Sequence, residues 1–597
     1  MTQAFIPILP ESAPFTPEQR AYLNGFLAGL FSRAPGPVAD PAATPNPSRL
    51  QAITILSGSQ TGTAEKLAKR MAKEAGKHGF AATVHDLSKF SPEQLAAESK
   101  VLFVTSTYGD GEPPDNARGF WKALRSDGAP RLGQLSFSVC ALGDSNYPRF
   151  CQFGKDLDAR LLALGAVPLH PRQDCDADFE RPFQGWLTAV LTRLAAAAGS
   201  ESPSSATSVA LAETTAVASD HEPAGWSRSR PFPARLRTNR RLSAADSSKD
   251  VRHFEIDLLD SGIDYEVGDA LGVWPTQCPE LADSLLEALG FDGEEAVTGR
   301  DDLSVPLRLA LTHHLELGRI PPALLEFYAR QSGDPDLLHL LSPEANGELP
   351  RFLRGRDVLD LVAGWPRVRP TASEFVALLR RLQPRLYSIA SSPKAHPGEV
   401  HLTVSAVRYQ SLGRARRGVA SCFLADRCGS DTPLPVYVHS NPAFRPPAPD
   451  APLIMIGPGT GIAPFRAFLE ERRAVGAPGR NWLFFGDQHE RTDFLYREEI
   501  EAFQASGFLH RLNLAWSRDQ EAKIYVQHHM QTCSADLWRW LEDGACVAVC
   551  GDASRMAKDV DDALRQVITQ SGGKTVEQAA EYLERMQSQR RYIRDVY

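Results

Sequence analysis

The chain has 597 residues, of which 43% are hydrophobic and 23% charged, and its formal net charge is -8. This length is too great for a single hydrophobic core, and about 150 residues per domain predicts roughly four domains. The acidic balance argues against a general nucleic-acid-binding protein.

Membrane and disulfide-rich classes are also disfavoured. No segment approaches the ~20 consecutive apolar residues that span a bilayer, and the N-terminus lacks the pattern of a secretory signal, so we expect a cytoplasmic protein. The nine cysteines include no Cys-x-x-Cys pair. They fit neither a disulfide framework nor a zinc ribbon nor an iron–sulfur cluster. We expect this chain to bind no metal ion, and a reaction that needs one would take it from another chain.

An amphipathic helix is predicted near the N-terminus, in residues 17 to 31. One helical face carries its apolar residues Tyr22, Leu23, Phe26, Leu27, Leu30 and Phe31. The Pro- and Ala-rich stretch 34 to 48 cannot bury enough apolar surface to offset its ordering entropy, so we expect a linker there. Residues 1 to 47 are therefore predicted to supply a helix for assembly or for a partner. The alternative is that the helix packs on its own domain.

Residues 48 to 198 predict a doubly wound α/β domain. Short apolar runs alternate with amphipathic helices such as 64–78, and the runs lie at 53–56, 101–104 and 137–142. This rhythm is typical of a parallel sheet whose ligand site lies at the carboxyl ends of its strands. The Ala-, Ser- and Thr-rich residues 199 to 225 then predict a second flexible linker.

Three strand ends in this domain carry hydroxyl, glycine and tyrosine residues. The first, Ser57 to Thr63, runs into a helix but lacks the Gly-Lys-[Ser/Thr] of a triphosphate site, so it suits one phosphate monoester. The segments 105–116 and 142–151 place Tyr108 and Tyr147 where they could enclose a flat ring. Together the three loops resemble a flavodoxin with FMN. The residues predicted to bind FMN are Ser59, Gln60, Thr61, Gly62, Thr63, Ala64, Ser106, Thr107, Tyr108, Gly109, Leu142, Gly143, Asp144, Asn146, Tyr147 and Cys151.

Residues 226 to 447 predict an antiparallel β-barrel with a helical insert at about 278 to 382. The β-like runs that flank the insert are 252–259, 385–390, 399–408 and 435–439. The barrel is therefore built from segments on both sides of the insert.

The run Arg385-Leu-Tyr-Ser388 resembles the strand that holds a flavin in ferredoxin-reductase-type enzymes. By that resemblance, Arg385 would pair with a pyrophosphate, Tyr387 would pack on the isoalloxazine, and Ser388 would bond the flavin nitrogen that accepts hydride. The residues predicted to bind FAD are Arg385, Leu386, Tyr387, Ser388, Thr403, Val404, Ser405, Tyr409, Gly418, Val419, Ala420, Ser421 and Tyr597.

Residues 448 to 597 predict a second α/β domain with a dinucleotide site. A strand at 453–456 leads into a glycine loop and then a helix, which permits close phosphate approach. A later stretch, from Ser517 to Gln527, combines a hydroxyl, two cations and an aromatic ring, which suits the 2′-phosphate of NADPH. The residues predicted to bind NADPH are Gly457, Gly459, Thr460, Gly461, Ser517, Arg518, Lys523, Tyr525, Gln527 and Asp559.

The order of flavodoxin-like FMN domain, FAD barrel with helical insert and ferredoxin-reductase-like NADPH domain resembles the diflavin reductase family over nearly the whole chain. Within it, Trp538-Arg-Trp540 and the terminal Asp595-Val-Tyr597 are similar to the flavoprotein (alpha) subunits of assimilatory NADPH-sulfite reductase. The resemblance implies that Ser388, Cys550 and Asp595 assist hydride transfer. Tyr597 is interpreted as a lid that stacks on the flavin ring until nicotinamide displaces it.

This resemblance implies an NADPH-dependent flavoprotein oxidoreductase. Electrons would pass from NADPH to FAD to FMN and on to a haem-bearing (sirohaem, iron–sulfur) sulfite reductase subunit, which reduces sulfite to sulfide for cysteine biosynthesis. The alternative is a soluble diflavin reductase that serves a haem-thiolate monooxygenase or another acceptor. A flavin-binding scaffold without turnover is a third reading.

The expected partners are the haem subunit and further copies of this chain, which would bind through the N-terminal segment. We expect this chain to bind neither nucleic acid nor a membrane. An acidic rim on the FMN domain predicts docking on a basic partner surface, and it comprises Asp110, Glu112, Asp115 and Asp144.

Overall fold

The computed structural model describes residues 51–59, 62–109, 111–144, 149–176, 179–199, 225–299, 303–345 and 347–597. Residues Ala52–Tyr597 form one compact unit. The helix predicted at 17–31, the linker at 34–48 and most of the linker at 199–225 lie outside the described residues. So do Asp110 of the acidic rim and four residues predicted to bind FMN, namely Gln60, Thr61, Asn146 and Tyr147. Within the described ranges, no helix is long and apolar enough to cross a membrane.

The first sheet has the strand order β2-β1-β3-β4-β5, and β6 also pairs with β4. Neighbouring strands β1, β3 and β4 run parallel. The strands are β1 (Gln51–Gly58), β2 (Phe80–Asp86), β3 (Lys100–Ser106), β4 (Ser136–Leu142), β5 (Val167–Pro168) and β6 (Gln173–Cys175). The helices are α2 (Thr63–Lys77), α3 (Pro92–Ala97), α4 (Arg118–Arg125), α5 (Gln152–Ala163) and α6 (Glu180–Gly199).

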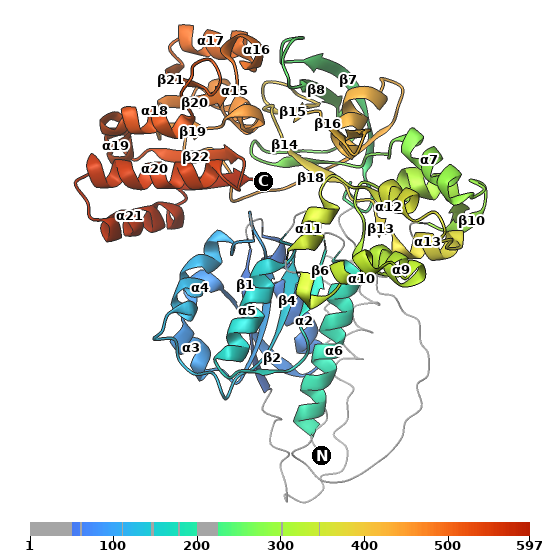
Figure 1. The fold of residues 1–597 in the computed structure, drawn as a ribbon. Coiled ribbons are helices and arrows are strands. Elements are labelled where there is room, and N and C mark those ends of the chain that lie inside the picture. Colours follow the sequence, from blue (N-terminus) through green and yellow to red (C-terminus); the bar gives the residue numbers. More distant parts are fainter. Residues whose placement is uncertain are drawn as a thin grey trace, which may run out of the picture. The chain divides into compact units, whose positions relative to one another are not determined.

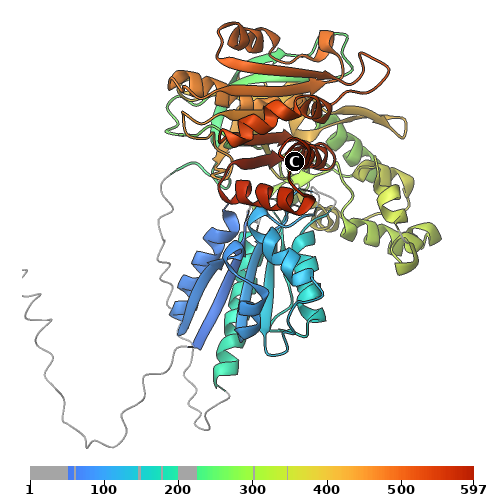
Figure 2. The same cartoon turned by 90° about the vertical axis from the view of Figure 1, so that its left-hand side faces the viewer.

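Helices cover both faces of this sheet because successive residues on its strands point to opposite sides. Phe103 of β3 packs with α4 and α5, whereas its neighbour Leu102 packs with α2 and α6. Figure 2 shows the blue strands between their helices. Strands buried on both faces read as nearly continuous apolar runs, which is why the sequence identified them. The predicted doubly wound domain is confirmed.

The second sheet is antiparallel, with the order β14-β9-β18-β7-β8-β15. Its strands are β7 (Phe232–Arg241), β8 (Val251–Asp257), β9 (Ala270–Val273), β14 (Arg385–Ser388), β15 (Glu399–Ser405) and β18 (Leu434–His439). The two edge strands meet just beyond β14, where Ile389 bridges Leu402 and the Ala390 amide donates to the His401 carbonyl at 2.8 Å. This contact closes the sheet toward a barrel, as the sequence predicts.

The helical insert lies between β9 and β14 in the chain and has its own apolar core. Its longer helices are α7 (Pro279–Leu289), α9 (Pro322–Ser332), α12 (Val358–Gly364) and α13 (Ala372–Leu378). Asp357 and Asp360 form a capping box at the start of α12. The same carboxylates pair with Arg414 and Arg416 of the hairpin β16 (Arg408–Ser411) and β17 (Arg414–Arg417), so a single charged cluster joins insert and barrel.

The third sheet is parallel throughout, with the order β21-β20-β19-β22-β23. Its strands are β19 (Leu453–Ile456), β20 (Asn481–Asp487), β21 (Leu509–Trp516), β22 (Cys546–Gly551) and β23 (Tyr592–Val596). Its main helices are α15 (Ala463–Ala474), α17 (Arg497–Ala505), α18 (Val526–Thr532), α19 (Ser534–Glu542), α20 (Met556–Gln570) and α21 (Val576–Ser588). Figure 1 shows α19, α20 and α21 together along one side of this sheet. The C-terminal residues thereby form an edge strand that carries Asp595.

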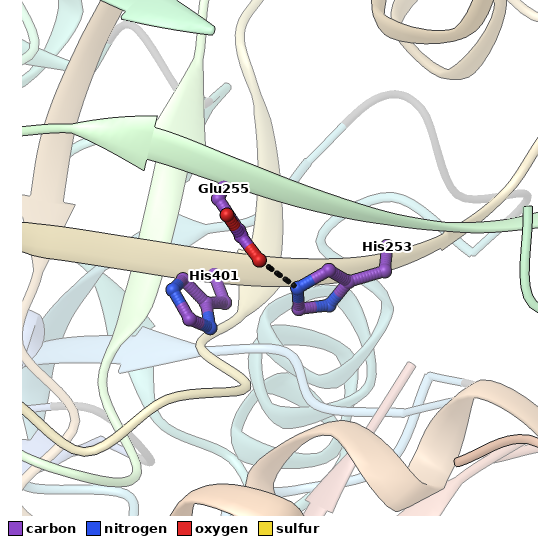
Figure 3. A group of neighbouring side chains, drawn as sticks. All are labelled: His253, Glu255 and His401. Carbon is purple, nitrogen blue, oxygen red and sulfur yellow. Dashed lines mark hydrogen bonds and ion pairs between the residues drawn. The ribbon is translucent and has the colours of Figure 1, made fainter. Parts of the chain in front are cut away.

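A histidine cluster lies on one face of the paired strands β8 and β15 (Figure 3). His253 Nε2 is 3.2 Å from a Glu255 carboxylate oxygen, and His253 Nδ1 is 2.8 Å from the Tyr496 hydroxyl. Burial, reinforced by the Arg466 guanidinium, lowers the pKa of His253 to about 4 and that of His401 to about 2. Both histidines are therefore neutral at pH 7.

The spacing of His253, Glu255 and His401 would also allow a metal ion. Arg466 opposes one, because its Nη1 lies 3.3 Å from His401 Nδ1 and places a positive charge beside the group. The expectation that this chain binds no metal stays a prediction.

Candidate functional site

The first two strand ends of the flavodoxin-like sheet lie together at the start of α2. The Ser59 amide donates to Asn116 Oδ1 at 2.9 Å, and the Ser59 hydroxyl accepts from the Ala64 amide at 3.2 Å. Thr105 Oγ1 is buried without a hydrogen-bond partner among the described atoms. Hydroxyls and free amides at a helix N-terminus fit a phosphate monoester. Gly62 and Thr63 lie at this same helix start.

The second and third loops are tied to each other by short hydrogen bonds. The Thr107 amide donates to the Leu142 carbonyl at 3.0 Å, and the Phe153 amide donates to Thr107 Oγ1 at 3.2 Å. Cys151 lies beneath the third loop, where burial raises the pKa of its thiol to about 12. The structure thus brings the described residues of the three predicted FMN loops to one edge of the sheet. These residues include Ser106, Gly109, Gly143 and Asp144.

Tyr108 contacts the C-terminal strand, which the sequence did not predict. Its hydroxyl donates to the Arg594 carbonyl at 3.4 Å and accepts from the Val596 amide at 3.2 Å. Arg594 also forms an ion pair with Asp115, and burial of this arginine leaves its Nε without a partner among the described atoms. Asp115 therefore binds within the chain, whereas the sequence interpretation placed it on a rim facing a partner.

A cavity of about 320 Å³ lies between the helical insert and the β16–β17 hairpin. Three residues predicted to bind FAD line it, namely Tyr409, Gly418 and Val419. Sequence reasoning missed its cationic lining, which consists of Arg356, Arg414, Arg416, Arg417 and Arg427. The arginine-rich run 414–417 was the available signal.

The lining of this cavity fits an anionic group. The Nε atoms of Arg416 and Arg427 are buried without hydrogen-bond partners among the described atoms. A Cβ at Gly418 would lie 2.5 Å from Ser421 Oγ, so only glycine leaves this space open. Unsatisfied buried donors favour an acceptor such as a pyrophosphate.

The other residues predicted to bind FAD lie on or beside the neighbouring strands. Arg385 of β14 pairs with Glu316 at 3.1 Å. On β15, Thr403 Oγ1 is 2.7 Å from the Tyr496 hydroxyl, and Val404 is buried in the barrel core. These three side chains therefore bind within the protein. Leu386, Tyr387 and Ser405 lie on these strands, and Ala420 and Ser421 follow Gly418 in a short helix.

Ser388, Cys550 and Asp595 come together from three different strands. The Ser388 hydroxyl donates to Asp595 Oδ2 at 2.6 Å, and Cys550 Sγ is 4.0 Å from the same oxygen. Cys550 and Asp595 are direct register partners of β22 and β23. Burial raises the pKa of Asp595, against the effect of the Ser388 hydrogen bond, and raises the pKa of the Cys550 thiol. A hydroxyl, a thiol and a carboxyl thus meet at one partly buried position.

The terminal Tyr597 is held by its backbone beside this group. Its amide donates to the Gly551 carbonyl at 3.1 Å, and its carbonyl accepts from the Ala553 amide at 3.0 Å. The phenol oxygen is 3.0 Å from Thr460 Oγ1 of the glycine loop, while the residue stays 48% exposed. The ring is therefore positioned by backbone hydrogen bonds and half exposed.

A cavity of about 400 Å³ opens at the carboxyl edge of the third sheet. Five residues predicted to bind NADPH line it, namely Gly459, Ser517, Tyr525, Gln527 and Asp559. The glycine loop approaches β22 so closely that a Cβ at Gly461 would lie 2.2 Å from the Cys550 carbonyl. Gly457 precedes this loop, and Arg518 and Lys523 are exposed outside the cavity lining. Sequence reasoning missed Lys249, Asp487, Asp552, Arg555 and Met556 in the same lining.

Three family models match this chain in the same order as its three sheets. The flavodoxin model matches residues 55–186, the FAD binding domain residues 225–423, and the oxidoreductase NAD-binding domain residues 455–562. These three domain types indicate that the cofactors are FMN, FAD and a nicotinamide dinucleotide.

Close similarity to characterised relatives extends over nearly the full length. The chain is 44% identical over 589 residues to the sulfite reductase [NADPH] flavoprotein alpha-component of Bacillus subtilis (strain 168), covering 98% of this chain and 96% of the relative. It is 42% identical over 604 residues to the proteins of the same name from Citrobacter koseri and Escherichia coli O157:H7, covering 100% of this chain and 99% of each relative. The chain therefore belongs to the family of sulfite reductase [NADPH] flavoprotein alpha-components, diflavin oxidoreductases with FMN, FAD and NADPH domains.

Proposed function

We propose that this chain passes electrons from NADPH through FAD and FMN to a haem-bearing sulfite reductase subunit. The observation that carries the proposal is the convergence of Ser388, Cys550 and Asp595 beside the NADPH cavity, in a chain with full-length similarity to sulfite reductase flavoproteins. When bound, nicotinamide and flavins supply hydride transfer and single-electron transfer. The sulfite chemistry belongs to the partner.

The chain's own residues would orient and stabilise this transfer. The Ser388 hydroxyl donates a hydrogen bond to the Asp595 carboxylate, which orients both side chains. With a flavin bound, the Ser388 hydroxyl would turn to the flavin nitrogen that accepts hydride. The carboxylate of Asp595 would then face the positive charge that develops on nicotinamide, and Cys550 would exclude water from the same position.

The binding residues are assigned by domain. Residues 48–198 would hold FMN through their three loops, 226–447 would hold FAD through β14, β15 and the arginine-lined cavity, and 448–597 would hold NADPH. Tyr597 would cover the flavin ring until nicotinamide replaces it. Ser517, Arg518 and Lys523 would bind the 2′-phosphate.

Residues 1–47 would join copies of the chain into an oligomer in the cytoplasm. Deleting them should leave a flavin-loaded NADPH oxidoreductase of smaller mass by light scattering, because no cofactor motif lies in this segment. An unchanged mass would contradict this part of the proposal.

A pull-down from the native cells tests the partner. We expect a flavin spectrum with FMN and FAD in equal amounts, a sirohaem-type band in the captured protein, and sulfide production from sulfite with NADPH. A haem-thiolate protein captured in its place would support the alternative acceptor. Absence of NADPH-dependent dye reduction would contradict the enzyme assignment itself.

A further inference from the structure

A lysine and a buried carboxylate face each other across the mouth of the NADPH cavity. Lys249 lies in the connection between β7 and β8 of the barrel, and Asp487 is the last residue of β20. Lys249 Nζ donates to Asp487 Oδ1. The Asp487 side chain is 1% exposed and that of Lys249 is 31% exposed, so a buried carboxylate binds a partly exposed lysine.

The second carboxylate oxygen of Asp487 points toward the glycine loop. Asp487 Oδ2 is buried and has no hydrogen-bond partner among the described atoms. It lies 3.8 Å from the position that a Cβ at Gly459 would occupy. The backbone carbonyl of Asp487 meanwhile accepts from the amide of Ser517 at 2.9 Å. An unsatisfied oxygen therefore lies between the glycine loop and the Ser517 end of the cavity.

A dinucleotide would bring a doubly charged pyrophosphate to this loop. The charged residues around Asp487 are Lys249 from the β7–β8 connection, Asp493 from α16 (Glu490–Asp493), and Asp552, Arg555 and Asp559 from the start of α20. Tyr525 is the remaining titratable group of the lining. Acidic groups outnumber cations among these residues. Bringing the anionic pyrophosphate among them therefore costs binding free energy unless one carboxylate loses its charge.

Among these carboxylates, Asp487 is the one best placed to take up a proton and lose its charge. Burial raises its pKa, against the effect of Lys249, and the charge of Asp493 raises it further. Asp552, by contrast, accepts hydrogen bonds from Ser554 and from following amides, and its pKa is lowered.

We propose that Lys249 and Asp487 form a charge switch for the pyrophosphate of the nucleotide. In the structure the carboxylate of Asp487 binds the lysine. When the dinucleotide enters, Lys249 turns to the pyrophosphate, and Asp487 takes up one proton from solvent and donates it as a hydrogen bond to a nucleotide oxygen. The inference rests on the proposed function of the cavity as the NADPH site.

Titration calorimetry of the full-length, flavin-loaded oxidised protein tests the switch. The ligands are NADP⁺ and 2′-AMP, which share the 2′-phosphate while only NADP⁺ has a pyrophosphate. Each ligand is titrated in buffers of equal pH that differ in their heat of ionisation. The change in binding heat from buffer to buffer gives the number of protons taken up. We expect NADP⁺ to take up more protons than 2′-AMP, by up to one per site, and its Kd to rise as pH rises by up to about tenfold per unit.

Variants separate the two members of the pair. Asp487→Asn should abolish the excess proton uptake and flatten the pH dependence of the NADP⁺ Kd. Lys249→Met should weaken NADP⁺ while leaving 2′-AMP unchanged. The control Lys394→Met removes an exposed lysine of the connection between β14 and β15 that pairs with Glu471 of α15, and it should change the binding of neither ligand.

Equal proton uptake by the two ligands, or an excess that survives in Asp487→Asn, would overturn the inference. Arg518→Ala should weaken both ligands because both carry the 2′-phosphate. If neither ligand binds the parent protein, the assignment of the cavity to NADPH fails, and the switch fails with it.

Discussion

At the scale of single residues, a hydroxyl and a thiol that are far apart in the chain approach the same carboxylate oxygen of Asp595. Asp595 Oδ2 accepts from Ser388 and lies 4.0 Å from the Cys550 sulfur. Burial raises the pKa of Asp595 because the carboxylate loses solvation, and the hydrogen bond from Ser388 opposes this effect. Such a carboxylate interacts strongly with any charge that forms nearby.

Asp595→Asn should slow flavin reduction by NADPH about 100-fold or more without changing the preference for NADPH over NADH. The amide keeps the shape of the side chain but removes the charge that would stabilise the forming nicotinamide cation. Stopped-flow flavin absorbance with each nucleotide measures both quantities. If nucleotide affinity falls as much as the rate of flavin reduction, Asp595 instead has a role in nucleotide binding.

Tyr597→Ala should tighten the binding of both nucleotides and improve the use of NADH relative to NADPH. The stacked ring no longer competes with nicotinamide, and stacking of about 0.5 to 1.5 kcal/mol corresponds to about two- to tenfold. Tyr597→Phe is the matched control, because it keeps the ring and loses the contact with Thr460. An unchanged ratio of NADPH to NADH use in Tyr597→Ala would show that the terminus is no lid.

At the scale of elements, the register of β8 and β15 produces the histidine cluster. Glu255 pairs directly with His401, and His253 pairs with Thr403, so all these side chains share one face. Burial beside Arg466 keeps both histidines neutral. The cluster lowers the stability of the barrel at any pH at which the same histidines are protonated in the unfolded chain.

The pairing of β8 and β15 should weaken as pH falls below about 6.5. The pKa values of folded His253 and His401 are about 4 and about 2, so below pH ~6.5 the unfolded chain binds protons that the folded chain does not. The expected loss is about 1.4 kcal/mol per pH unit for each histidine, reduced by His396, whose pKa is raised by Glu470.

Hydrogen exchange of the β8 and β15 amides at pH 7.5 and 5.5, corrected for the intrinsic exchange rate, measures this loss. The double variant His253→Gln/His401→Gln should remove most of it. His313→Gln, which changes an exposed histidine of the insert, should not. Equal protection at both pH values in the parent protein would contradict the prediction.

At the scale of the whole molecule, β23 connects the nucleotide site to the second FMN loop. Its residues Arg594 and Val596 bind Asp115 and Tyr108, while Asp595 between them binds Ser388. These three consecutive residues of one strand therefore contact two different domains. The C-terminal strand is therefore a physical link between them.

Asp115→Asn should loosen this link. Loss of a charge-assisted bond of about 1.5 to 3 kcal/mol would raise the exchange rate of the Val596 amide by about 10- to 100-fold. Glu112→Gln is the matched control, because Glu112 pairs with Arg118 of its own domain at 3.2 Å. Exchange at Val596 that responds equally to both substitutions would show that the Arg594 pair contributes nothing specific.

The sequence by itself determined the three sheets, their order along the chain and the positions of β1, β3, β4, β8, β14, β15, β18 and β19. Strands buried on both faces must be nearly continuous apolar runs, and glycine or hydroxyl residues at their ends mark ligand loops. Among the strands that it missed, β7 is rich in arginine, with only Ala234 and Leu236 buried, and β9 has only four residues.

Only the tertiary structure decided which distant residues meet. The contact of Asp115 with Arg594, the carboxylate of Asp487 beneath Lys249 and the arginines around Gly418 join segments that are far apart in the chain. Local pattern reflects periodicity within an element, whereas these contacts depend on how separate elements pack. The residues around Asp115 and Lys249 in the chain do not indicate that these side chains pair with Arg594 and Asp487.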